Sequence, residues 1–189
     1  MQLSGVYGGR NLASPTEMTG DPYITVLRYC AVMLESGPIW NMWMNNIADL
    51  TTGCRDDVIF VVDESRSVGD VNYGLMKSFL SDLVGKLDID SGNTRVGLVP
   101  YSTIVDTREA FNLNAHSSVA SVQSAISSLT WGGRFGFTFT DRALAHVRTK
   151  MLTSAAGDRS DAPNVVFVLT NGRSTDNAGT QVCTVWKSV

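Results

Sequence analysis

Cysteine is scarce in this chain of 189 residues, which contains three, Cys30, Cys54 and Cys183. Three scattered cysteines are too few for a disulfide scaffold, and an odd count leaves at least one thiol without a partner inside the chain. The chain has no Cys-x-x-Cys pair, the usual signature of a zinc site or a redox motif. The composition therefore does not predict a fold held together by disulfides or structural zinc.

The chain also lacks runs of basic residues and long runs of apolar residues. The chain has no lysine or arginine block and its formal net charge is −3, which argues against nucleic acid as a partner. Residues 23–34 are the most apolar early stretch, but Arg28 interrupts them and they are shorter than the roughly 20 residues that span a bilayer. We therefore expect no membrane insertion.

The first ten residues lack the basic start, apolar middle and small-residue cleavage site of a signal peptide. Two interpretations of this stay open. The chain is either intracellular or a piece of a longer protein whose export signal lies elsewhere.

The residues that are present fit one folded domain with an appendage. Hydrophobic residues make up 43% of the chain, enough for one sizeable core. Residues 54–189 carry the pattern of that domain, whereas residues 1–53 change character several times and show no clean period. We predict a short helix over residues 40–50. We interpret this N-terminal segment as a cover for an exposed edge or as poorly ordered chain.

A strand, a helix and a second strand follow one another from residue 58. Residues 58–62 are an unbroken apolar run, typical of a parallel strand covered on both faces. Residues 96–101 give the second strand, and a right-handed crossover makes the two strands parallel. Gly69 and Asp70 offer a cap for the helix between them. Its apolar residues recur at intervals of three and four, at Met76, Phe79, Leu80, Leu83 and Leu87.

The alternation continues to the end of the core. Residues 103–111 predict a short strand, placed at an edge because Asp106 and Arg108 are costly to bury. Four further segments follow: a helix over 119–129 capped by Ser117 or Ser118, a glycine-rich loop over 131–137, a helix over 143–151 and a third core strand over 165–169. The predicted fold class is α/β, with a Rossmann-like open, mostly parallel sheet and helices on both faces.

Oxygen-bearing side chains follow two of the core strands. Asp63, Ser65 and Ser67 come directly after the first, Thr138 follows the glycine-rich loop, and Asn171 follows the third. Because ligands of open α/β sheets bind at the carboxyl ends of the strands, we expect these side chains to meet there. Hydroxyl, carboxylate and amide oxygens suit a hard cation such as Mg²⁺, which keeps several waters.

The order of these motifs resembles the von Willebrand factor type A (VWA) domain. Asp-x-Ser-x-Ser follows a hydrophobic strand, Gly-Gly precedes Thr-x-Thr-x-x-Ala-Leu, and Val-Val-Phe-Val-Leu-Thr-x-Gly comes last. The resemblance covers residues 57–175 and is to the extracellular group typified by matrilins, collagen VI and integrin inserted domains. It implies an extracellular location.

The resemblance also implies a metal-ion-dependent adhesion site (MIDAS). Ser65, Ser67 and Thr138 would coordinate Mg²⁺ or Mn²⁺ directly, while Asp63 would hold one of its waters. A carboxylate from the partner would complete the coordination. Thr140, two residues on, is the alternative to Thr138, because the loop over residues 134–137 is longer than the family's usual connection.

Two departures from the family pattern stand out. Asn171 occupies the place where the family has a second aspartate, which removes one negative charge beside the ion. One hypothesis is that the Asn171-Gly172 pair deamidates with age and restores a carboxylate. The family fold also continues past this strand with further helices and two more strands. We therefore expect the C-terminal strands and helices of the fold to be missing here.

The leading functional hypothesis is a non-enzymatic adhesion module. Its partner would be an extracellular matrix or cell-surface protein, such as a collagen-like ligand, bound through the cation. The alternative is a degenerate or truncated VWA domain with metal-independent binding or none. A hydrolase with Ser65 as nucleophile is disfavoured because no Gly-x-Ser-x-Gly elbow surrounds it. Asp63 as phosphate acceptor is disfavoured because Ser65 stands where a second carboxylate would be needed, and the chain has no Gly-x-x-x-x-Gly-Lys loop.

Overall fold

The computed structural model describes residues 6–7, 10–11, 24–30, 55–132, 136–171 and 174–175. The predicted helix over residues 40–50 and the expectation for the chain beyond residue 175 lie outside these ranges. The described elements are β1 (Val6–Tyr7), β2 (Arg10–Asn11), β3 (Ile24–Cys30), β4 (Asp56–Asp63), α2 (Gly69–Val84), β5 (Thr94–Tyr101), α3 (Val119–Ser128), α4 (Thr140–His146), η1 (Val147–Met151), η2 (Ser154–Ala156) and β6 (Asn164–Thr170).

The central sheet has four strands in the order β3-β6-β4-β5, and every neighbouring pair is parallel. The two short strands β1 and β2 form a separate antiparallel pair. All eight residues of β4 are buried, as the unbroken apolar run predicts for a central strand. The predicted α/β class with an open, mostly parallel sheet is confirmed.

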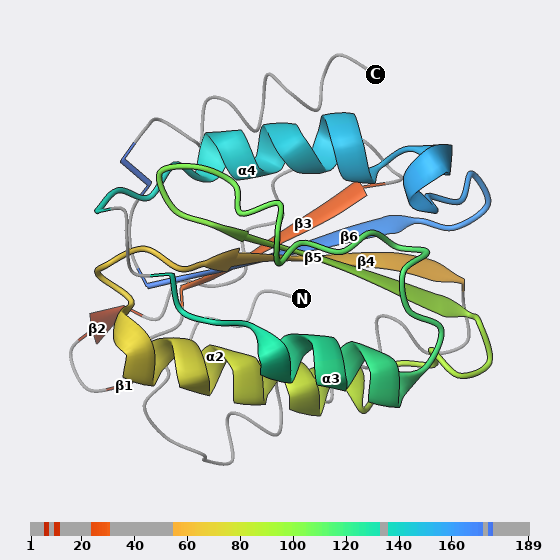
Figure 1. The fold of residues 1–189 in the computed structure, drawn as a ribbon, viewed down its shortest axis with the longest axis horizontal. Coiled ribbons are helices and arrows are strands. Elements are labelled where there is room, and N and C mark those ends of the chain that lie inside the picture. Colours follow the sequence, from red (N-terminus) through yellow and green to blue (C-terminus); the bar gives the residue numbers. More distant parts are fainter. Residues whose placement is uncertain are drawn as a thin grey trace.

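Helices cover both faces of the sheet, with α2 and α3 below it and α4 above it in Figure 1. The alternation of side chains along β4 divides the core accordingly. Val58, Phe60 and Val62 pack with α2 and α3, whereas Ile59 and Val61 pack with α4. Each such side chain contributes roughly 1.5–3 kcal/mol when it is fully buried. No helix in the described ranges has the length and apolarity needed to cross a membrane.

Strand β3 lies along the outer side of β6. Its register runs from Ile24 opposite Asn164 to Cys30 opposite Thr170. Part of the N-terminal segment therefore covers an edge of the sheet, in agreement with one of the two interpretations of its sequence. The division of the chain into residues 1–53 and 54–189 remains a prediction.

The prediction of an edge strand over residues 103–111 is wrong. This segment makes only two isolated bridges to β5, Leu98 with Phe111 and Tyr101 with Val105, within the described chain. Asp106 accounts for the interruption, because its carboxylate accepts hydrogen bonds from the backbone N–H and the guanidinium of Arg108. Such local side-chain bonds compete with a strand ladder.

The predicted N-terminal cap is confirmed for α3 but not for α2. Ser118 caps α3, accepting from the Ser121 N–H at 3.2 Å while the Ser121 hydroxyl accepts from the Ser118 N–H at 3.3 Å. Helix α2 has Val68 at its N-cap, which has no side-chain oxygen to offer, and Asp70 lies in the first turn. The expected cap by Gly69 and Asp70 is therefore wrong.

The last predicted helix is confirmed, although it changes form along its length. It begins as α4 and ends as a π-helical turn, η1. Its apolar positions Ala143, Leu144, Val147 and Met151 are all buried against the sheet, as their spacing predicts.

Candidate metal centre

The candidate site lies where β4 and β6 end. These strands are neighbours in the parallel sheet, so their carboxyl ends emerge side by side. Strand β4 ends at Asp63 and β6 at Thr170. Topology therefore brings Asp63 close to the residues that follow β6, although they are far apart in the sequence.

Asp63 is fully buried, with both carboxylate oxygens occupied. Oδ1 accepts from the Ser65 N–H at 2.8 Å and Oδ2 accepts from the Thr170 hydroxyl at 2.7 Å. Burial raises the pKa of the carboxyl, and these hydrogen bonds from Thr170 and Ser65 act in the opposite direction. Asp63 thus fixes the loop beneath the site.

The hydroxyls of Ser65 and Ser67 lie 3.0 Å apart, and the Ser67 hydroxyl donates to Oδ1 of Asn171 at 3.2 Å. The amide Nδ2 of Asn171 donates to the carbonyl oxygen of Ser67 at 2.6 Å. Ser65 is buried, Asn171 is half-buried and Ser67 is exposed, so solvent reaches the group at Ser67. The structure brings four of the five predicted site residues together in one hydrogen-bonded group.

Thr138, the fifth, is held near the same edge by its backbone. Its N–H donates to the Thr175 hydroxyl at 3.0 Å, and its carbonyl accepts from the Thr175 N–H at 2.7 Å and the Ser174 hydroxyl at 3.1 Å. The next residue, Phe139, donates its N–H to the carbonyl of Ser102, just past the end of β5. Thr138 is thereby tied to a segment that starts three residues after Asn171.

The alternative ligand, Thr140, is engaged elsewhere. Its hydroxyl lies 3.0 Å from the hydroxyl of Tyr101 in the buried core. This contact favours Thr138 over Thr140 as the threonine available to a ligand.

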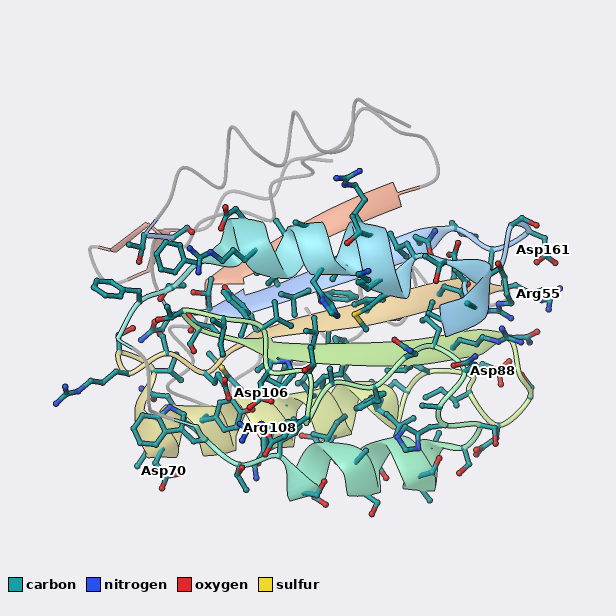
Figure 2. The ribbon with its side chains drawn as sticks, turned by 45° about the horizontal axis from the view of Figure 1, so that its top comes forward. Arg55, Asp70, Asp88, Asp106, Arg108 and Asp161 are labelled. Carbon is teal, nitrogen blue, oxygen red and sulfur yellow. The ribbon has the colours of Figure 1, made fainter. Side chains whose placement is uncertain are left out.

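Glu64 is a buried acid at the flank of the site. Its side chain packs against Gly132, where an added Cβ would lie 3.1 Å from Oε2, so only glycine allows this approach without a shift. Burial, together with the negative charges of Asp106 and Glu109, raises the pKa of Glu64 to about 7. Figure 2 shows Asp106 and Arg108 close to each other and well away from Arg55 and Asp161, which lie at the right-hand end of the molecule.

The donor set fits a hard cation better than a soft one. Its members are hydroxyl, carboxylate and amide oxygens, the ligands that Mg²⁺ and Mn²⁺ prefer. In the described part of the chain, no group of three or more His, Cys, Asp or Glu side chains could hold a metal. A cation at this site would therefore depend on the serine and threonine hydroxyls, with Asp63 as the single carboxylate.

Three partners of the site were not predicted. Thr170 binds the Asp63 carboxylate, whereas Ser174 and Thr175 bind the backbone of Thr138. Thr170 had a sequence signal, because a threonine that ends a core strand lies at the ligand-binding edge. Ser174 and Thr175 had none, since the chain after Asn171 shows no periodic pattern.

An open parallel α/β sheet with oxygen-bearing side chains at the carboxyl ends of its strands defines a Rossmann-like α/β domain. The particular family follows from comparison. The model of the von Willebrand factor type A domain matches residues 57–188, and the chain belongs to this family.

The relatives include matrix proteins. The chain is 42% identical over 127 residues to matrilin-1 of Mus musculus, covering 64% of this chain and 24% of the relative. It is 36% identical over 124 residues to the collagen alpha-1(XX) chain of Homo sapiens, covering 66% of this chain and 9% of the relative. The chain thus spans a quarter or less of these relatives.

Solved structures of proximal thread matrix protein 1 from the mussel byssus share the fold. One has a TM-score of 0.64 at 25% identity, covering 71% of this chain and 35% of that one. Another, described as having a zinc-occupied MIDAS motif, has a TM-score of 0.63 at 24% identity, with coverages of 71% and 36%.

Proposed function

We propose that this domain is a non-enzymatic adhesion module of the extracellular matrix. It binds an acidic side chain of a protein partner through Mg²⁺ or Mn²⁺, with Ser65, Ser67 and Thr138 as direct ligands. Asp63 and Asn171 hold waters of the ion. The observation that carries the proposal is the pair of Ser65 and Ser67 hydroxyls, 3.0 Å apart between Asp63 and Asn171.

A matrix location and a protein partner are supported by the relatives, which include a matrilin and a collagen chain. The partner we propose is an extracellular matrix or cell-surface protein such as a collagen-like ligand. A cation at the site is supported by the byssus protein with a zinc-occupied MIDAS motif, which shares the fold.

A binding role is preferred to a catalytic one because of what surrounds Ser65. Its hydroxyl pairs with another hydroxyl, that of Ser67, rather than with a base that could activate it. Asp63 is likewise fully buried, with its two oxygens hydrogen-bonded to Ser65 and Thr170, which disfavours it as an acceptor of a phosphoryl group.

Calorimetric titration with MgCl₂ and MnCl₂ tests the cation site. We expect saturable binding that is weakened at least about tenfold in Ser65→Ala and unchanged in Ser128→Ala, an exposed serine of α3. Capture on a collagen-coated surface should then fall when EDTA is added. If Ser65→Ala and the wild type titrate alike, the assignment of the ligands is wrong.

A second function, metal-independent binding, is favoured by the contacts of Asn171. Its amide meets the hydrogen-bonding needs of Ser67 without any cation. In that case EDTA leaves capture on the coated surface unchanged, so the same experiment separates the two functions.

A further inference from the structure

Asn171 makes a cation-free site chemically complete. The Ser67 hydroxyl needs an acceptor and finds Oδ1 of Asn171 at 3.2 Å, while the Ser67 carbonyl needs a donor and finds Nδ2 at 2.6 Å. An amide offers an acceptor and a donor side by side, whereas an ionised carboxylate offers acceptors alone. The asparagine is thus matched to the loop as it stands without a metal.

An aspartate at position 171 would reverse this match. One carboxylate oxygen would still accept from the Ser67 hydroxyl, but the other would face the Ser67 carbonyl at the distance now spanned by the Nδ2 bond. Two acceptors with no proton between them repel each other. A hydrated cation between Ser65, Ser67 and the new carboxylate would remove this repulsion, because its waters supply the missing donors.

The chain carries the means of making this change by itself. Gly172 follows Asn171, and a glycine amide can approach the preceding side chain without interference from a Cβ. The Gly172 nitrogen attacks Cγ of Asn171, a C–N bond forms, and the side-chain nitrogen leaves as ammonia. Water then opens the resulting succinimide to aspartate, or to isoaspartate if the other carbonyl is attacked.

Two features of the structure favour attack at Cγ. The Ser67 hydroxyl donates to Oδ1 and so draws electron density away from the carbon. Asn171 is also half-buried rather than enclosed, so water can reach the succinimide.

From these contacts we infer that Asn171 is a deamidation site whose conversion to aspartate switches the loop from a form that is hydrogen-bonded without a cation to a form that needs one. The inference rests on the proposed function, since it concerns the affinity of the same site. It makes the chemical age of the protein a regulator of its adhesion.

The experiment compares three proteins, the wild type and the variants Asn171→Asp and Gly172→Ala. Each is titrated with MgCl₂ when fresh and again after prolonged incubation at neutral pH and physiological temperature. Peptide mass spectrometry against synthetic standards distinguishes asparagine, aspartate and isoaspartate at position 171. Thermal melts in EDTA and in MgCl₂ give a second measurement that does not depend on binding a partner.

We expect aspartate to accumulate at position 171 in the wild type and to be suppressed in Gly172→Ala. Fresh Asn171→Asp should bind Mg²⁺ about 10- to 100-fold more tightly than the fresh wild type. It should melt below the wild type in EDTA and recover in MgCl₂. Aged wild type should gain affinity in proportion to its aspartate content.

Three results would count against the inference in different ways. If the fresh wild type and Asn171→Asp both bind Mg²⁺ but the aged wild type keeps asparagine or yields only isoaspartate, the inference fails and the proposed function stands. If the melting temperature of Asn171→Asp in EDTA is no lower than that of the wild type, the inferred repulsion between the new carboxylate and the Ser67 carbonyl does not exist. If neither protein binds Mg²⁺, the cation site itself fails and the inference falls with it.

Discussion

The two ends of the central sheet differ in the polar groups that they carry. At the amino end, Arg159 is 7% exposed and pairs with the fully buried Asp57. Its guanidinium also donates to the carbonyls of Asp56, Gly92 and Asn93, so the buried charge is hydrogen-bonded on several sides. At the carboxyl end, the hydroxyls of Ser65 and Ser67 are neutral and open to solvent at Ser67.

This difference separates groups that stabilise the fold from groups that can bind a ligand. A buried charge pair with committed donors has nothing left to offer a ligand, and removing one member leaves the other uncompensated. Neutral hydroxyls that bond to each other lose little when a cation replaces those bonds. The amino end therefore ties chain segments together, and the carboxyl end is the end that can exchange partners.

Arg159→Ala should produce the largest loss of stability. It leaves the Asp57 carboxylate buried without its cation, which costs about 3–5 kcal/mol in the free energy of unfolding measured with urea. Arg55→Ala is the matched control, because Arg55 pairs with Asp161 with both side chains more than half exposed. The control should change stability by less than about 1 kcal/mol. Equal effects in the two variants would break the distinction between the ends.

Thr170→Val should cost less, about 1–3 kcal/mol, because it leaves one oxygen of the buried Asp63 without its hydrogen bond. The same change should weaken Mg²⁺ binding about 10- to 100-fold. Thr140→Val removes a buried hydroxyl that contacts Tyr101 instead. Calorimetry on this control should show unaltered Mg²⁺ affinity. A similar loss of affinity in both variants would point to general loosening of the fold.

Asp106→Asn should have a smaller, pH-dependent effect. Hydrogen bonds from Arg108 lower the pKa of Asp106 below its ordinary 3.8, so the folded state holds this proton less tightly than the unfolded state. The pair therefore stabilises the fold above about pH 4 and loses this contribution as the pH falls through the lowered pKa. Because Arg108 is largely exposed, we expect at most about 1 kcal/mol.

Urea unfolding measured below about pH 5 checks the Asp106 prediction. In this range Glu64 is protonated in the folded state, because its pKa is raised to about 7, and its own titration does not obscure that of Asp106. The free energies of unfolding of the wild type and Asp106→Asn should converge as the pH falls. A difference that stays constant with pH would show that the aspartate acts through packing rather than charge.

Ser67→Ala should change stability least, by about 0.5 kcal/mol or less, since Ser67 is exposed. The Mg²⁺ affinity of Ser67→Ala should nevertheless fall at least about tenfold, as it does when a residue that supports a metal ligand is lost. Ser78→Ala removes an exposed hydroxyl of α2 and serves as the control. A large stability loss in Ser67→Ala without a change in Mg²⁺ affinity would place Ser67 among the residues that hold the fold.

Much of the fold could be read from the sequence because strand β4 is apolar on both faces. Such a pattern is typical of a parallel strand covered on both faces, and Val58 to Val62 show it without interruption. Strand β3 gave no such signal, since its place beside β6 depends on a pairing between residues 24–30 and 164–170. Pairings across such a separation leave no local pattern.

The site was readable for a different reason. Asp63, Ser65 and Ser67 are two residues apart, and Asn171 directly follows a recognisable strand, so topology alone brings them together. The wrong edge strand over residues 103–111 shows the limit. There a short-range bond between Asp106 and Arg108 overrode the tendency of the segment, and such bonds are visible only in three dimensions.

The position of β6 has a consequence for how the molecule forms. β6 is the last of the four sheet strands in the chain, yet it lies between β3 and β4. During synthesis, β4, α2 and β5 can assemble as a local unit, while β3 has no neighbour to pair with until β6 emerges. The four described strands are therefore joined when β6 pairs with β3 on one side and β4 on the other, and the same event places Asn171 beside Ser67.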